Sequence, residues 1–258
     1  TSGKDYLSPN FELIVDDILE QSQKMRLINF LEKWLKDKID AVLKSLVDLK
    51  HIKENNSSIK ALAYQLYENN GVLKREQVTE YLKNLGQNER KILRDLGVKF
   101  GRYHIFLYRL IKPEPVSLRT LLWKNYHQKY FNLKPPVFGL NFVDDKNFKD
   151  RNYMLLCGFE KFNNFFIRID ILERLFMQII NSSTQKEKEI KMIPEMLNLL
   201  GCSKNNFKKL LQSMNYKTVE KDDQLFFKYN PKKNNNKIFK KKTRKESPFE
   251  VLKNLNFN

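Results

Sequence analysis

The chain has 258 residues, of which 41% are hydrophobic and 30% charged, and its formal net charge is +18. This length allows roughly one large domain or two to three small ones, and a positive excess of this size attracts polyanions. No apolar run approaches the ~20 residues of a membrane-spanning helix, the start lacks the apolar stretch of a signal peptide, and two cysteines are too few for a disulfide scaffold. We therefore expect a cytoplasmic protein that binds a polyanion and no membrane. Because the first residue is threonine, we also expect a fragment or a processed product.

The first half of the chain predicts a helical bundle. Apolar residues recur at intervals of three and four, which places them on one side of each helix. Glycine, alone or after asparagine, follows three of the four patterns and supplies the left-handed residue that ends a helix. The expected helices are one over 24–49, one capped by Ser57 or Ser58 and stopped at Asn70-Gly71, one over 78–85 and one over 88–96.

An aromatic strand and a further helix follow. Apolar residues occupy the even-numbered positions over 98–100 and the odd-numbered positions over 103–107. A slip of one residue at Gly101 predicts a β-bulge. The prolines at 113 and 115 should break the chain, and Ser117 can cap a leucine-rich helix.

The segment Lys134-Pro135-Pro136 predicts a linker to the second half. We expect a short strand over 137–143, a helix over 152–159 and a strand over 165–170 that runs into a helix capped by Asp170. The asparagine-, serine- and lysine-rich stretch after that helix predicts a polar loop.

The order of elements near the C-terminus is more specific. A short helix over 193–200 ends at Gly201, and Ser203 caps a second over 204–215. Two short apolar strands then predict a hairpin. Three helices followed by a hairpin are typical of a winged helix, a relative of the helix-turn-helix. The expected class is mainly α with short β elements: a helical bundle over 1–132, a winged-helix-like module over 133–230, and a disordered polybasic tail with a short terminal helix over 231–258.

Catalytic and metal-binding patterns are absent from the sequence. Gly3-Lys4 lacks the upstream glycine and the following Ser or Thr of a phosphate loop. The three histidines lack zinc spacing, and the two cysteines lie far apart. Asp144-Asp145 and Asp222-Asp223 could do acid/base work or bind a cation, but solvated turns are the simpler interpretation. Cys157 and Cys202 could be nucleophiles only beside a base. We therefore predict no catalytic residue, metal or cofactor in this chain.

Two segments are candidates for binding nucleic acid. The helix after Ser203 has an apolar side and an opposite basic and amide-bearing side, which suits phosphates and base edges. The tail is basic without any acidic residue between 231 and 245. An ordinary solvated helix face and a merely solubilising tail are the alternatives. The aromatic residues Tyr103, Phe106 and Tyr108 could stack on unpaired bases or pack in the core. The candidate binding residues are Asn205, Lys208, Lys209, Gln212, Lys232, Lys233, Lys237, Lys240, Lys241, Lys242, Arg244 and Lys245.

The stretch "LGVKFGRYHIFLYRLIKPEPVSLRTLLW" resembles a segment of a family of alphaproteobacterial superfamily-two (DEAD/DEAH-type) helicases related to the mitochondrial degradosome RNA helicase. Other stretches match in the same order, among them "GFEKFNNFFIRIDILERL", "LLGCSKNNFKKLLQSMNY" and "SPFEVLKNL". The likeness runs from about Phe11 to Leu255, but Tyr108 stands where the family usually has proline. In such helicases this region lies C-terminal to two motor domains that bind ATP and Mg²⁺.

The resemblance implies an accessory region that binds nucleic acid, with single-stranded RNA favoured over DNA. It implies that the partners are nucleic acid and the protein's own N-terminal motor domains, which this chain lacks. The parent protein would hydrolyse ATP, whereas this chain carries no such motif. The alternatives are a stand-alone winged-helix regulator, a ribosome-associated RNA binder, or a scaffold for protein interactions.

Overall fold

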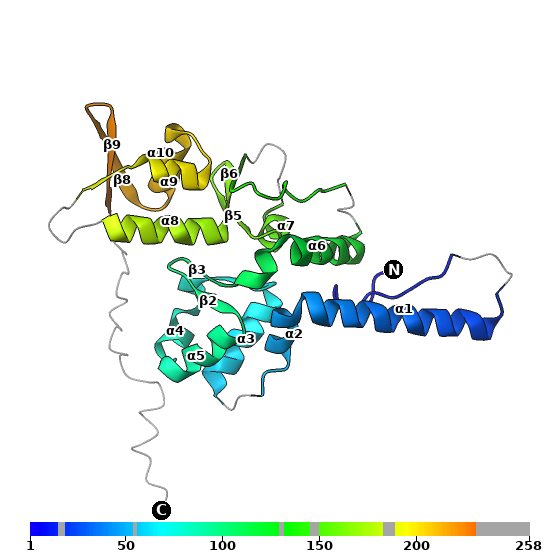
Figure 1. Ribbon diagram of the computed structural model, residues 1–258. Coiled ribbons are helices and arrows are strands. Elements are labelled where there is room, and N and C mark those ends of the chain that lie inside the picture. Colours follow the sequence, from blue (N-terminus) through cyan, green and yellow to red (C-terminus); the bar gives the residue numbers. More distant parts are fainter. Residues whose placement is uncertain (15–18, 54–55, 129–131, 145–149, 183–188, 231–258) are drawn as a thin grey trace, which may run out of the picture.

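The computed structural model describes residues 1–14, 19–53, 56–128, 132–144, 150–182 and 189–230. It confirms a mainly helical chain with short antiparallel strands. Figure 1 shows α1 projecting from the body, α2–α5 on one side of it, and α8–α10 with β8 and β9 on the other. No helix of the described residues is long and apolar enough to cross a membrane.

The elements of the first half alternate short helices with three short strands. They are α1 (Gln21–Val42), α2 (Lys44–Lys50), α3 (Ser57–Glu68), β1 (Val72–Lys74), the 3₁₀ helix η1 (Arg75–Val78), α4 (Thr79–Lys83), α5 (Gln87–Asp95), β2 (Val98–Phe100), β3 (His104–Leu107), the 3₁₀ helix η2 (Tyr108–Ile111) and α6 (Pro113–His127).

The predicted helix over 24–49 is in fact two helices. The backbone leaves the helical conformation at Leu43, which has φ −103° and ψ 22° and is fully buried. The break lets α2 place Leu46 and Leu49 in the core, where α2 packs on α3. The free energy gained by burying these leucines therefore exceeds the cost of interrupting the helix.

The cap of α3 is not the predicted serine. Asn56 Oδ1 accepts the backbone N–H groups of Ser58 at 2.9 Å and Ile59 at 3.3 Å, which satisfies two donors of the first turn. The predicted stop is confirmed, because Asn70 and Gly71 follow the helix in the left-handed region.

The predicted β-bulge at Gly101 is wrong. β2 and β3 are separate strands of an antiparallel hairpin, with Val98 opposite Leu107 and Phe100 opposite Ile105. The alternation of apolar residues shifts by one position because the chain reverses direction between the two strands. On its other edge β3 pairs with β1, a strand that was not predicted.

α6 begins at Pro113, so the predicted cap Ser117 lies inside the helix. Proline is well accepted in a first helical turn, since the N–H that it lacks would have no intrahelical partner there.

The second half holds two further three-stranded sheets among its described residues, with orders β4-β6-β5 and β7-β9-β8. Its elements are β4 (Phe142–Asp144), α7 (Arg151–Leu156), β5 (Phe159–Phe162), β6 (Phe165–Arg168), α8 (Ile169–Ser182), β7 (Ile190–Lys191), α9 (Pro194–Leu200), α10 (Lys204–Ser213), β8 (Tyr216–Lys221) and β9 (Gln224–Tyr229).

Three local predictions in this half need correction. The strand expected over 137–143 is reduced to β4. The helix expected over 152–159 is α7, which ends before β5 begins. Asp170 does not cap α8, which starts one residue earlier; its carboxylate instead pairs with Arg168 Nε at 2.7 Å.

The caps and turns of the C-terminal unit agree with the sequence. Ser203 Oγ accepts the N–H of Asn206 at 3.3 Å, and Gly201 is left-handed with φ 66°. Asp222 and Asp223 form the turn between β8 and β9, with φ values of 49° and 61°. This two-residue turn makes the strands longer than predicted. β7 is an additional strand beside β9.

The hydrophobic core crosses the predicted boundary at 132. Val116 and Trp123 of α6 belong to one buried cluster with Val143, Tyr153 and Phe166. The two halves therefore share an interior.

A buried arginine lies where the two halves meet. Arg119 of α6 has an exposed fraction of 1%. Its Nη1 donates to Asn70 O at 2.8 Å, and its Nη2 donates to Leu110 O at 2.7 Å and to Leu156 O at 2.8 Å. The carbonyls of Leu110 and Leu156 lie in the last turns of η2 and α7, where carbonyls lack intrahelical donors and carry partial negative charge. The carbonyl of Asn70 belongs to the turn that follows α3. Burial lowers the pKa of Arg119, but a guanidinium stays charged in proteins.

A second buried contact joins the halves through side chains. Glu173 of α8 accepts the backbone N–H groups of Arg102, Tyr103 (3.0 Å) and His104 (2.8 Å). His104 Nε2 lies 3.1 Å from Glu160 Oε2, and its Nδ1 lies 3.4 Å from Glu173 Oε1. The turn between β2 and β3 is thus held against α8 and β5.

The charges of this cluster depend on one another. Burial opposes the charged form of His104, but the two carboxylates outweigh it and raise the pKa of His104. Burial would also raise the pKa of Glu160, but the hydrogen bond with His104 and the charges of Lys74 and Arg151 lower it to about 2.

We predict that Arg119→Met destabilises the fold by at least about 3 kcal/mol, since each buried carbonyl left without a donor costs ~1–3 kcal/mol. Urea unfolding measures the difference. Exposed Arg109→Met is the matched control and should change stability by less than about 0.5 kcal/mol. Equal losses from the two variants would contradict the role given to Arg119.

We predict that His104 makes stability depend on pH. Its folded pKa lies above the unfolded value of about 6.5, so its charged contacts contribute fully below that value and are lost as pH rises through the folded pKa. The difference in unfolding free energy between the wild type and His104→Gln should therefore be larger at about pH 6 than at about pH 9. Above about pH 5 the carboxylate of Glu160 stays ionised in both states. A difference that does not change with pH would show that His104 is neutral throughout.

Candidate nucleic-acid interface

The apolar side of α10 is buried and its polar side faces solvent, as the sequence predicted. Phe207, Leu210 and Leu211 are fully buried against α8, α9 and the sheet β7-β9-β8. The opposite side faces solvent: Asn205, Lys209 and Gln212 are exposed, and Lys208 is half-buried.

Part of this polar side contacts β8. Lys208 Nζ lies 3.2 Å from Glu220 Oε1, and Gln212 Nε2 donates to Thr218 Oγ1 at 3.3 Å. The helix and the hairpin therefore form one continuous surface. An exposed ion pair contributes only ~0–1 kcal/mol, so Lys208 can exchange Glu220 for a phosphate at little cost.

A groove of about 420 Å³ lies at the junction of the two halves. We call it the junction groove. Its walls come from β1 and η1, the β2–β3 turn, the β5–β6 hairpin, the end of α10 and the end of β9. Its cationic residues are Lys74, Arg75, Arg102 and Lys161, its aromatic residues are Tyr103, Phe162 and Tyr229, and its carboxylates are Glu76 and Glu160.

Backbone contacts shape the groove. Arg75 Nη1 donates to Gly101 O at 2.8 Å, and Arg75 N donates to Tyr103 O at 2.7 Å. A Cβ at Gly101 would overlap the carboxylate of Glu173, so glycine permits the close approach of α8. The neighbouring Arg102 is exposed, and its guanidinium makes no hydrogen bond or ion pair with the described part of the chain.

The aromatic residues of the groove differ in accessibility. Tyr229 is 50% exposed and contacts Tyr216 edge to face at 5.3 Å. Tyr103 packs on Phe176 at 4.2 Å, and burial raises the pKa of its hydroxyl. Of the aromatics suggested as stacking residues, Phe106 is buried in the core, and Tyr108 lines a different pocket.

The sequence did not point to the cations of this groove. Lys74 comes from β1, Arg102 from the β2–β3 hairpin and Lys161 from the β5–β6 hairpin, and these segments are far apart in the chain. Strand pairing places β1 beside β3. The contacts of His104 with Glu160 and Glu173 then hold the second sheet and α8 against the first sheet.

The candidate residues of the tail, between 232 and 245, lie outside the described residues. The described chain ends beside the groove, where Asn230 N donates to Asn215 O at 2.8 Å. The last described residue before the basic tail therefore lies at the rim of the junction groove.

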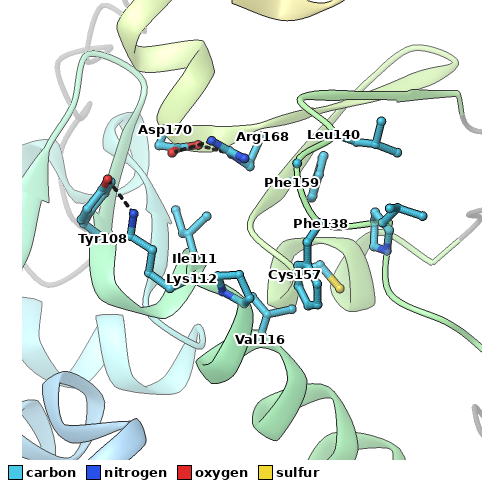
Figure 2. Close-up of a pocket in the computed structure, with 14 residues that line it drawn as sticks. Tyr108, Ile111, Lys112, Val116, Phe138, Leu140, Cys157, Phe159, Arg168 and Asp170 are labelled. Carbon is cyan, nitrogen blue, oxygen red and sulfur yellow. Dashed lines mark hydrogen bonds and ion pairs between the residues drawn. The ribbon is translucent and has the colours of Figure 1, made fainter.

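A smaller pocket of about 140 Å³ lies between η2, the start of α6 and the segment 136–140 (Figure 2). Its polar groups are already paired: Arg168 with Asp170, and Lys112 Nζ with Tyr108 OH at 2.9 Å. Cys157 lines it, but burial raises the pKa of this thiol to about 12, so it is not a thiolate near neutral pH. Burial likewise raises the pKa of Cys202 to about 11.

Among the residues that the structure describes, no group of three or more His, Cys, Asp or Glu side chains could hold a metal ion. The polar side of α10 and the junction groove instead combine cations, amides and an accessible aromatic ring, which suits phosphates and bases.

Comparison of the chain with known proteins adds no family to these observations. No protein-family model, no curated protein and no solved structure matches it significantly. The helicase resemblance therefore stays a prediction from the sequence.

Proposed function

We propose that this chain binds nucleic acid, single-stranded RNA in preference to DNA, as the C-terminal accessory region of an ATP-dependent RNA helicase. The observation that carries the binding function is the junction groove with its four cationic residues. The helicase context rests on the sequence resemblance alone. In that context the missing motor domains bind ATP and Mg²⁺ in the cytoplasm, and this chain by itself does not hydrolyse ATP.

The order of elements supports a winged-helix interpretation of the C-terminal unit. The chain runs α8-β7-α9-α10-β8-β9, and its sheet has the order β7-β9-β8. α10 then takes the place of the recognition helix, and the β8–β9 hairpin takes the place of the wing. Lys209 and Asn205 are the side chains of α10 most available to a ligand.

A single strand suits the groove better than a duplex. The aromatic ring of Tyr229 can stack only on a base that is not enclosed in a double helix. The cations around it can contact phosphates without reading sequence. We therefore expect binding that tolerates most sequences.

We predict that Arg102→Ala with Lys161→Ala weakens binding of single-stranded RNA and makes its salt dependence shallower. Two lost phosphate contacts should reduce the slope of log affinity against log salt by about 1.4. Lys208→Ala with Lys209→Ala should act similarly. Lys33→Ala with Lys91→Ala removes the same charge from exposed positions on α1 and α5. Equal effects of the groove variant and this control would contradict the proposed interface.

We predict that ending the chain after Asn230 also weakens binding. The removed segment carries eight basic and no acidic residues between 231 and 245. If about five of them contact phosphates, they contribute about −3.5 to the salt slope of the full chain. Anisotropy titrations at several salt concentrations measure both quantities. Unchanged affinity and salt slope would show that the tail makes no phosphate contact, and the proposed interface would then consist of the junction groove and α10.

A further inference from the structure

A second groove, unrelated to the junction groove, is lined by aromatic side chains. It encloses about 730 Å³ between the N-terminal segment, α2, α3 and α6. None of its residues lines the junction groove. We call it the aromatic groove. Its ring-bearing residues are Tyr6, Tyr64, Tyr67, Trp123, Tyr126 and His127.

Helical spacing brings these rings to the two walls of the groove. Tyr64 and Tyr67 are three residues apart on α3. On α6, Tyr126 and His127 follow Trp123 by three and four residues. Residues at these intervals share one side of a helix. Each wall therefore presents several rings to the same space.

The rings of α6 support one another. Trp123 and His127 lie 4.3 Å apart between centroids, and Tyr126 meets His127 edge to face at 5.1 Å. Trp123 also contacts Tyr153 of the core at 5.7 Å and is only 7% exposed. This packing fixes the orientation of the rings and reduces the conformational entropy that a ligand would have to restrict.

Two tyrosines remain largely open to solvent. Tyr64 is 64% exposed and Tyr126 is 38% exposed. Exposed tyrosines on two helices that line one groove offer flat apolar rings, and both faces of a planar ligand can pack against such rings.

The charges of the groove nearly cancel. Lys50 lies 5.2 Å from the centroid of Tyr67, and its hydrogen bond with that hydroxyl raises the pKa of Lys50. Lys60 is exposed. The carboxylates of Asp5 and Glu68 offset these two cations, and Asp5 already accepts the N–H of Leu7 at 2.9 Å. A ligand would therefore be held here by its planar faces rather than by its charge.

We propose that the aromatic groove binds the unpaired bases of a single-stranded nucleic acid by stacking. Bases stack on aromatic side chains whatever their identity, and the net charge of +18 favours a polyanionic ligand over a basic or proline-rich peptide. The proposal rests on the proposed function and deepens it, because it adds a contact that depends on bases and hardly on salt.

Tyr64→Ala with Tyr126→Ala tests the proposal in the full chain. Affinity for a single-stranded oligouridine should fall about tenfold or more, within the range for stacked bases, while the salt slope stays unchanged. Tyr64→Phe with Tyr126→Phe should retain the affinity, because the rings remain. Phe30→Ala with Trp34→Ala removes two exposed rings from α1 and should have no effect.

A strand of equal length without bases provides the decisive comparison. The wild type and the Tyr64/Tyr126 alanine variant should bind this abasic strand equally. An equal loss of affinity for the abasic strand, or no loss for oligouridine, would overturn the proposal.

The fluorescence of Trp123 reports on the groove directly. The chain has two tryptophans, so Trp34→Phe leaves Trp123 as the single emitter. Oligouridine should quench the fluorescence of Trp123, and the abasic strand should not. The quenching should persist in the Arg102/Lys161 alanine variant at higher RNA concentrations.

The two proposals can fail separately. If the Arg102/Lys161 alanine variant loses RNA binding but oligouridine quenches Trp123 in no variant, this inference is overturned and the proposed function stands. Quenching by a proline-rich peptide but not by oligouridine would assign the groove to protein recognition instead.

Discussion

The fold depends on one guanidinium that is buried without a carboxylate. Arg119 donates to carbonyls of α7, of η2 and of the turn after α3, and these come from segments before and after α6. Helix ends buried in an interior need donors, and a buried cation needs acceptors. The two Nη groups of Arg119 meet both requirements at this point, whereas its buried Nε makes no hydrogen bond within the described chain. The contacts of Arg119 lie where two of the buried hydrophobic clusters contain residues from both halves of the sequence.

The second connection between the halves lies beside the proposed binding surface. Glu173 binds three successive backbone N–H groups of the β2–β3 turn, and Glu160 and His104 belong both to this buried cluster and to the wall of the junction groove. The residues that hold the groove open are therefore also residues that hold the fold together. We therefore expect substitution of Arg102 or Lys161 at the rim to separate the proposed binding from stability, whereas substitution of Glu173 or His104 should affect both.

Local signals in the sequence predicted only part of the local structure. Ser203 and Gly201 bound their helices as expected. The predicted caps Ser57 or Ser58, Ser117 and Asp170 were wrong, because each of these helices starts at or before the residue predicted to cap it. The hairpin at Gly101 was mistaken for a bulge, since alternation over two short strands does not show where the chain reverses. The polar side of α10 could be predicted from its helical spacing. The cations of the junction groove could not, because the pairing of β1 with β3 and the contact between two separate sheets bring them together.

The edge of the C-terminal sheet has a consequence for the behaviour of the protein at high concentration. β8 is an outer strand, and its free edge pairs with no other strand of the described chain. Such an edge can recruit the same edge of another copy and begin aggregation. Lys217, Glu220 and Lys221 place charges along it, and α10 side chains contact two of its residues. The opposite edge strand, β7, is only two residues long. Both edges therefore resist intermolecular β-pairing.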